Sequence, residues 1–177
     1  HAQLNGPATV DDVLYRIPWS SIFPWTVAVV PLGIARGAMS GAVEIANQKG
    51  RQGSSALLRD KETVQLEVGR SEAMIRAARA FLKDAMQKLM VAVDVGGDEL
   101  IAAEVEFRLA RAYAADSART VVDNLAAMLG AVSIFETANI ERYQRDVLAA
   151  AKHIAMSSNH YILAGRSGLG LEPGPRF

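Results

Sequence analysis

The chain has 177 residues, with 19 lysines and arginines, 19 aspartates and glutamates, and no cysteine. This length suits one domain with a sizeable core, and zero net charge excludes the basic patch typical of proteins that bind nucleic acid or anionic membranes. Without cysteine, the chain has no disulfide, thiolate nucleophile or zinc–thiolate site.

The composition favours closely packed helices. Half of the residues are hydrophobic but only 6% are aromatic, and alanine is frequent. The longest apolar stretch, residues 25–35 (WTVAVVPLGIA), is about half of the ~20 residues that a spanning helix needs, so we interpret it as part of a buried helix. We find no signal peptide and no histidine spacing typical of a metal site, and we expect a cytoplasmic protein with no membrane contact and no metal. Because the chain opens with His1, we expect a fragment of a longer protein.

The first segment, residues 1–21, contains proline and polar turn signals, including Pro7 and Pro18. We expect an extended lead-in from an upstream domain, followed by a helical domain with a C-terminal tail over residues 22–177. A first helix is predicted from Pro24, which a first turn tolerates, to Gln48. Pro31 lies inside this segment and predicts a kink or a later start.

The next predicted helix covers residues 62–95, after a polar loop over 49–61. Its apolar residues recur at helical spacing: Val64, Val68, Ile75, Leu82, Ala85 and Leu89. Gly96 and Gly97 predict a short stop. Asp98 is a suitable N-cap for a third helix over 99–129.

The last predicted helix covers residues 140–164, after a break over 130–139, with Gly165 as its C-terminal cap. Long helices joined by short connections lie antiparallel. The sequence therefore predicts an all-α fold, an up-and-down four-helix bundle.

His153 is the main catalytic candidate, because histidine exchanges a proton near neutral pH. A packed or surface histidine is the alternative, and we interpret His160, two turns later on the same predicted face, in that way. Arg145 and Asp146 fit exposed ion pairs of the first helical turn. Arg51, in a glycine-flanked loop, suits contact with a phosphate or with solvent.

Three groups of residues together resemble the C-terminal helical domain of acyl-CoA dehydrogenase-fold flavoproteins, and most closely its flavin-dependent, two-component monooxygenase branch. These groups are 14–18 (LYRIP) with 32–38 (LGIARGA); Arg51 with Val64-Gln65 and Ala77-Ala78-Arg79; and 142–146 (RYQRD) with His153, Gly165-Arg166 and 169–173 (LGLEP). The similarity extends over nearly the whole chain. The family's N-terminal helical and middle β-domains are absent from this sequence.

The resemblance implies a reduced-flavin and O2 monooxygenase that hydroxylates an aromatic or similar apolar substrate. It implies reduced FMN or FAD supplied by a separate reductase, and a homotetramer with flavin sites near subunit boundaries. It also implies that Arg51 contacts flavin phosphate. His153 would act as a base toward a phenol or as a hydrogen-bond partner of the oxygenated flavin.

Two other hypotheses remain open. The chain is similar enough to the dehydrogenases to belong to an oxidoreductase that acts on CH–CH bonds and retains its FAD. The third hypothesis is an oligomerisation bundle with no catalytic residue of its own.

Overall fold

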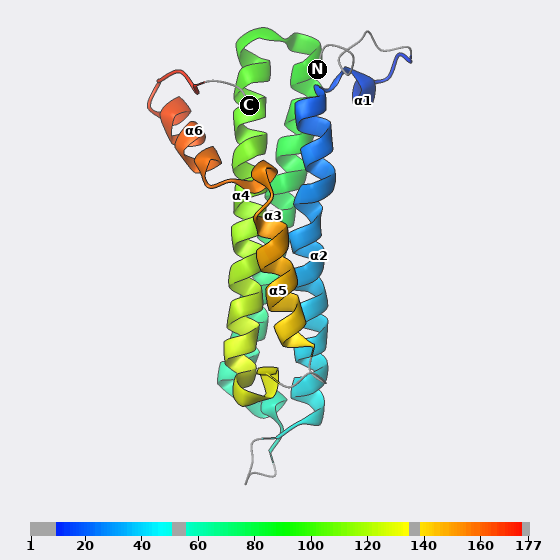
Figure 1. The fold of residues 1–177 in the computed structure, drawn as a ribbon, viewed down its shortest axis with the longest axis vertical. Helices are drawn as coiled ribbons and strands as arrows, with labels where there is room; N and C mark the ends of the chain where they lie inside the picture. The colour runs from blue at the N-terminus through cyan, green and yellow to red at the C-terminus, as the bar shows by residue number, and fades with distance from the viewer. Residues whose placement is uncertain (1–9, 51–55, 135–138, 175–177) are drawn as a thin grey trace.

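The computed structural model describes residues 10–50, 56–134 and 139–174, and in these ranges the chain is helical with no β-strand (Figure 1). The helices are α1 (Val13–Arg16), α2 (Trp19–Gln48), α3 (Glu62–Val95), α4 (Gly97–Leu129), α5 (Ile140–Ala151) and α6 (Asn159–Gly168). Short 3-10 turns are η1 (Leu58–Asp60), η2 (Gly130–Ile134) and η4 (Ile154–Met156). The predicted all-α, up-and-down bundle is confirmed.

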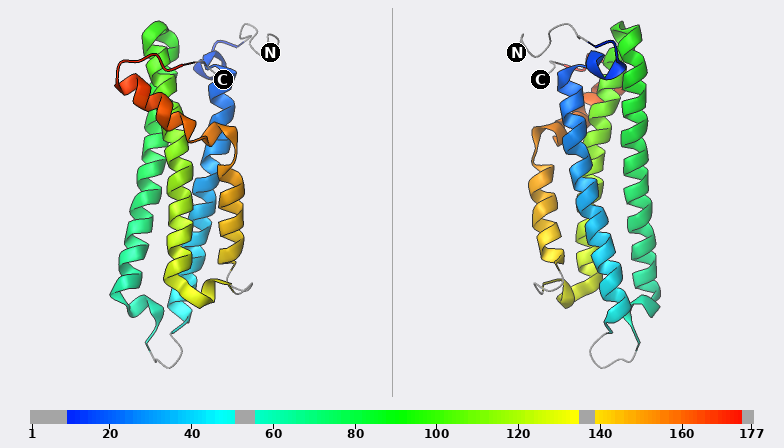
Figure 2. Two further views of the ribbon diagram at one scale, coloured as in Figure 1. Left: turned by 60° about the vertical axis from the view of Figure 1, so that its left-hand side comes forward. Right: turned by 90° about the vertical axis from the view of Figure 1, so that its right-hand side faces the viewer.

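The bundle is built around two long helices, α2 and α4, which contact each other. Helix α3 packs against both on one side, and the shorter α5 packs against both on the other (Figure 2). Helix α5 runs beside only part of the length of α4. Beyond its end the chain turns through η4, and α6 leads away from the bundle axis while still contacting α4.

The core is centred on α4, because this helix contacts α2, α3, α5 and α6. Its fully buried side chains include Phe107, Val121, Val122 and Leu125, which pack with Leu82 and Leu89 of α3. The face that α2 turns to the core is rich in alanine: Ala28, Ala35, Ala38 and Ala42 have no exposed surface. Such small side chains let helices approach closely, which explains the few aromatics in this core.

The start of the bundle differs from the prediction. The expectation of an extended lead-in is wrong for Val13–Arg16, where Asp12 caps a helical turn by accepting a hydrogen bond from the Leu14 N–H at 2.9 Å. Helix α2 already begins at Trp19 and continues through Pro24 and Pro31. Both prolines are buried, so packing compensates for the backbone hydrogen bond that each removes.

Most of the predicted helix ends in the middle of the chain are confirmed, but the predicted N-cap Asp98 is wrong. Helix α2 ends at Gln48, and α3 has the predicted bounds. Helix α4 begins slightly early: Gly96, at a φ of 75°, is its N-cap, and Asp98 lies inside the first turn. A carboxylate in the first turn still favours the helix, because it faces the positive end of the macrodipole.

The predicted single helix over 140–164 is wrong, because α5 ends at Ala151. Two side chains take over backbone N–H groups in the following turn. The His153 Nδ1 accepts from the Ala155 N–H at 3.1 Å, and the Ser157 Oγ accepts from the Asn159 N–H at 3.3 Å. Such local acceptors compete with helical hydrogen bonds.

Helix α6 continues past the predicted cap at Gly165 and ends at Gly168. His153 and His160 therefore lie on different elements, not on one helical face as predicted.

Helix α2 is, within the described ranges, the one helix long and apolar enough to cross a membrane by length and composition alone. Core helices of globular proteins meet the same criterion. Since α2 packs against α3, α4 and α5, we treat it as a core helix.

Candidate functional site

A cavity of about 340 Å³ opens where α5 has ended and the chain turns toward α6. Three regions form it: the first turns of α2, the middle of α4, and the segment from η4 into α6. Its lining residues are Phe23, Pro24, Arg108, Arg111, His153, Ile154, Ala155, Ser157, Asn159 and His160. An apolar wall from α2 and η4 thus faces a group of nitrogen-bearing side chains.

His153, the predicted catalytic residue, lies in this cavity and is half-buried. It is the N-cap of η4, because its Nδ1 accepts the hydrogen bond from Ala155. A neutral imidazole whose Nδ1 accepts a hydrogen bond carries its proton on Nε2. Among the described residues, none pairs with this Nε2, so the ring has a donor to offer to a bound molecule.

Aromatic side chains of α2 continue the apolar wall. The Phe23 ring lies 5.9 Å from the His153 ring, centroid to centroid, with the planes tilted by 55°. On its other side Phe23 stacks with Trp19 at 5.4 Å. These contacts hold Phe23 beside His153 although the side chain is 41% exposed.

Two arginines of α4 line the opposite wall. Arg108 is 8% exposed and Arg111 only 3%. The Arg111 guanidinium lies over the Phe107 ring, with Cζ 4.9 Å from its centroid, and its Nε has no hydrogen-bond partner among the described residues. Burial, and next the charge of Arg108, lower the pKa of Arg111 to about 10, so it stays protonated at neutral pH.

His160 completes the polar wall from the first turn of α6. It is 8% exposed, and its buried Nε2 has no hydrogen-bond partner in the part of the chain that the structure describes. Burial lowers its pKa to about 4, with the charges of Arg111 and Arg108 acting in the same direction. The ring is therefore neutral at pH 7.

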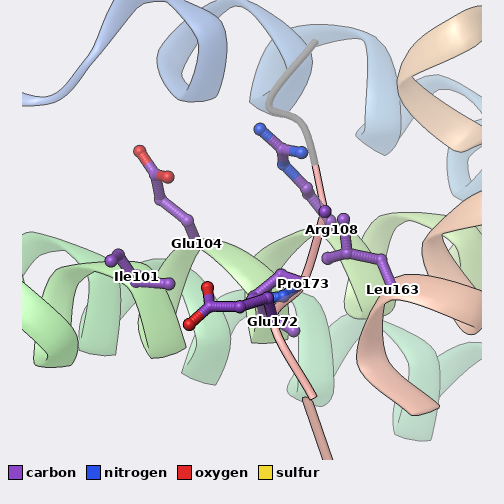
Figure 3. Close-up of a pocket in the computed structure, with 8 residues that line it drawn as sticks. Ile101, Glu104, Arg108, Leu163, Glu172 and Pro173 are labelled. Carbon is purple, nitrogen blue, oxygen red and sulfur yellow. The ribbon is translucent and has the colours of Figure 1, made fainter. Parts of the chain in front are cut away.

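A second, smaller cavity of about 80 Å³ adjoins the first, and Arg108 lines both. Figure 3 shows Glu104 and Arg108 leaving α4 on the same side, with Glu172 and Pro173 of the C-terminal segment beside them. Glu104 is buried, at 6% exposure, and its charge raises the pKa of Arg111. The two arginines and Glu104 thus form a charged stripe at spacings of four and three along α4.

Arg145 and Asp146 do not line this cavity. Arg51 lies outside the described residues. Arg145 pairs with Glu141 at 2.6 Å and Asp146 with Arg142 at 3.6 Å, all exposed, which confirms the ion-pair interpretation. In the described ranges, no group of three or more His, Asp or Glu side chains is arranged to hold a metal ion.

Arg108 and Arg111 were not predicted from the sequence, and His160 was interpreted as a packed or surface residue. One signal was present: charged residues at 104, 108 and 111 interrupt an alanine-rich helix on one face. A solvated face has the same pattern. Only the return of the chain through η4 and α6 buries this stripe.

Known proteins resemble the chain over most of its length. Indole-3-acetate monooxygenase of Pseudomonas putida is 26% identical over 173 residues, which are 98% of this chain and 44% of that protein. The flavin-dependent monooxygenase oxygenase subunit HsaA of Mycobacterium tuberculosis is 26% identical over 175 residues, 96% of this chain and 44% of that protein. The chain thus spans less than half the length of these curated relatives.

A solved structure and a family model also resemble the chain. The structure of XiaF from Streptomyces sp., in complex with FADH2 and glycerol, superposes with a TM-score of 0.84 at 25% identity, covering 100% of this chain and 45% of that one. The family described as acyl-CoA dehydrogenase, C-terminal domain, matches residues 25–158. This match includes α3, α4, α5 and the turn that carries His153, and the chain belongs to the acyl-CoA dehydrogenase C-terminal domain family.

Proposed function

We propose that this chain is the C-terminal domain of a reduced-flavin, O2-dependent monooxygenase that hydroxylates an aromatic or similar apolar substrate. One observation carries the proposal: His153 presents an unpartnered Nε2–H beside an apolar wall in a cavity. The similarity to indole-3-acetate monooxygenase and to HsaA supports it.

The residues of the cavity fit the reacting end of a flavin with its substrate. Phe23, Pro24 and Ile154 provide the apolar contacts that a ring system needs, and His153 provides one polar group on their border. We propose reduced FMN or FAD as the cofactor, and the FADH2 bound to XiaF favours FAD. When bound, the flavin supplies the electrons and the activation of O2. The residue for its phosphate is Arg51, which lies outside the described residues.

The role of this chain is to exclude water and to place one proton. The apolar wall keeps water from the reacting groups, which limits side reactions. His153 donates a hydrogen bond through Nε2 to an oxygen atom in the cavity. The other role implied by the resemblance, a base toward a phenol, would require a free basic nitrogen, and the Nδ1 is already used by the Ala155 N–H.

The oxygenase subunit name of HsaA supports a separate reductase as partner of the whole protein. We also propose a homotetramer located in the cytoplasm. The tetramer is implied by the family resemblance of the chain.

The test uses the full-length protein, chemically reduced FMN or FAD, O2 and a panel of aromatic substrates. Hydroxylated product and released H2O2 are quantified by mass spectrometry and a peroxide assay. We expect His153→Ala to lower product formation by about 10²-fold and to raise peroxide release, because one positioned hydrogen-bond donor contributes about this factor. His153→Ser should show the same loss, since serine replaces the N-cap of η4 but does not reach the cavity.

Lys152→Ala is the matched control, because Lys152 is exposed and adjacent but does not line the cavity. Full product formation in His153→Ser would reduce His153 to a structural cap. Absence of hydroxylation in the wild type, with FAD that stays bound and reduces in the presence of an acyl-CoA, would favour the dehydrogenase hypothesis. Wild-type activity in both His153 variants would favour an oligomerisation bundle.

A further inference from the structure

Arg111 is a buried cation, with a relative exposure of only 3%. Among the described residues, its Nε has no hydrogen-bond partner. Leaving a buried donor unpaired is costly, and more so for a charged group. Deprotonation does not remove this cost, because a pKa of about 10 keeps the guanidinium charged at neutral pH. Among the described residues, the Nε of Arg111 therefore lacks an acceptor.

The same cavity is lined by a second cation and by a buried histidine. Arg108 lies three residues before Arg111 on α4 and also lines the cavity. The two guanidinium charges repel each other, and Glu104 offsets only one of them. Across from them, the Nε2 of His160 is buried and unpartnered. The cavity is thus lined by two positive charges, and the Nε of Arg111 is a buried donor with no described acceptor.

A carboxylate matches this wall. It carries one negative charge and two oxygens that only accept hydrogen bonds, and guanidinium groups bind it in a planar, bidentate manner. The rest of the cavity is apolar, formed by Phe23, Pro24, Ile154 and Ala155, and its volume of about 340 Å³ admits a small ring system. The complementary molecule is therefore an aromatic acid, with its carboxylate on α4 and its ring against α2 and η4.

We propose that Arg111 and Arg108 bind the carboxylate of an aromatic carboxylic acid, and that this acid is the substrate whose ring lies beside His153. The proposal rests on the proposed function, since it names the substrate class for the same cavity. Arg111 provides the main contact because it is the more buried and has the unpaired donor. Arg108 adds a second positive charge.

The test measures binding apart from turnover. Phenylacetate and 2-naphthoate, and their primary amides, are titrated into the full-length protein with oxidised flavin by isothermal calorimetry. We expect each acid to bind about 10- to 100-fold more tightly than its amide, as hydrogen bonds to a charged pair are worth about that factor. Arg111→Gln should remove this preference by weakening the acid alone, and Arg108→Gln should reduce it less.

Arg119→Gln is the matched control, because Arg119 is an exposed arginine of the same helix that does not line the cavity. Equal affinities of acid and amide in the wild type, or an acid preference that persists in Arg111→Gln, would overturn the proposal. If an acid and its amide bind with equal affinity and both are hydroxylated, the carboxylate proposal is overturned but the proposed function stands. Acid-selective binding that depends on Arg111, without hydroxylation, would support the carboxylate site and reject the monooxygenase.

A carboxylate of another domain or subunit is the competing source of the same chemistry. Arg111→Met distinguishes the two. If Arg111 binds a ligand and has no partner in the ligand-free protein, Arg111→Met replaces an unpaired buried charge by an apolar side chain. The ligand-free variant is then as stable as the wild type or more stable. A strong loss of thermal stability in Arg111→Met, together with no acid preference in the wild type, would assign Arg111 to a protein carboxylate and overturn the proposal.

Discussion

His160 illustrates how a single buried group makes stability depend on pH. Its ring lies beside Arg111 and Arg108, in a position with 8% exposure, and its pKa is lowered from 6.5 to about 4. In the unfolded chain His160 binds a proton below about pH 6.5. In the folded chain it binds one only below about pH 4. The folded state therefore loses stability as the pH falls through this window.

We expect the free energy of unfolding of the wild type to fall between pH 6.5 and pH 4 by more than that of His160→Gln. The measurement is urea denaturation at several pH values, followed by circular dichroism. Carboxylates titrate in both proteins, so the difference between the two curves isolates His160. Parallel curves would mean that His160 is solvated or paired in the folded state.

The candidate site could be predicted only in part, because it depends on contacts between distant segments. His153 was identified from the chemistry of histidine and a family motif, and it lies in the cavity. Arg108 and Arg111 carry no motif, and their charges are as suitable for an exposed helix face as for a buried one. Residues 153–160 fold back over α4 and bury this face. No local sequence pattern predicts that contact.

At the scale of the helices, the contact between α2 and α5 depends on a glycine. A Cβ atom placed on Gly37 would lie 2.9 Å from the Tyr143 Cε1, closer than two such atoms can approach. Gly33, one turn earlier on α2, has no atom within 4 Å of the same position. Alanine substitutions at the two glycines can therefore be compared. Only the one at Gly37 disturbs packing, while both raise helix propensity.

We expect Gly37→Ala to destabilise the bundle by about 1–3 kcal/mol, because the Tyr143 ring must shift out of its place on α2. Gly33→Ala should instead stabilise it by about 0.5–1 kcal/mol, through the lower backbone entropy of alanine in the unfolded chain. Urea denaturation of both variants measures this. A stabilising effect of both substitutions would mean that α5 is not packed closely on α2.

The order of the helices and several of their ends could be predicted, because the signals are local. Apolar periodicity and the Gly96-Gly97 stop define α3 and the start of α4. The break after Ala151 could not, because residues 152–158 contain no proline or glycine and continue a helix-compatible pattern. The side-chain acceptors of His153 and Ser157 end the helix there, and their competition with the backbone is decided by tertiary packing.

At the scale of the whole molecule, one end of the bundle exposes large apolar side chains. These are Leu14, Tyr15, Trp19, Phe23, Val29 and Val30, from α1 and the first half of α2, each between 41% and 65% exposed. Contiguous apolar surface of this kind typically marks an interface. It suits contact with further copies of the chain or with other parts of a longer protein.

We expect the 177-residue chain to self-associate at micromolar concentration, and its mass by multi-angle light scattering to exceed that of a 19.0 kDa monomer. Val29→Lys combined with Val30→Lys should lower this mass, because two charges then lie on the apolar surface. Val91→Lys is the control, since Val91 is exposed on α3. If the wild-type chain is a monomer, this domain does not by itself form the proposed tetramer.

The early end of α5 has a consequence for how such a protein adapts to different ligands. Helices α2, α3 and α4 form the core along the whole bundle, while the space beside α4 is shared between α5 and the cavity. Moving the end of α5 by one turn, about 5.4 Å, would enlarge or fill the cavity without altering a core contact of α3 with α4. Ligand size in this architecture is thus adjustable through the length of one short helix, without changing the contacts between α3 and α4.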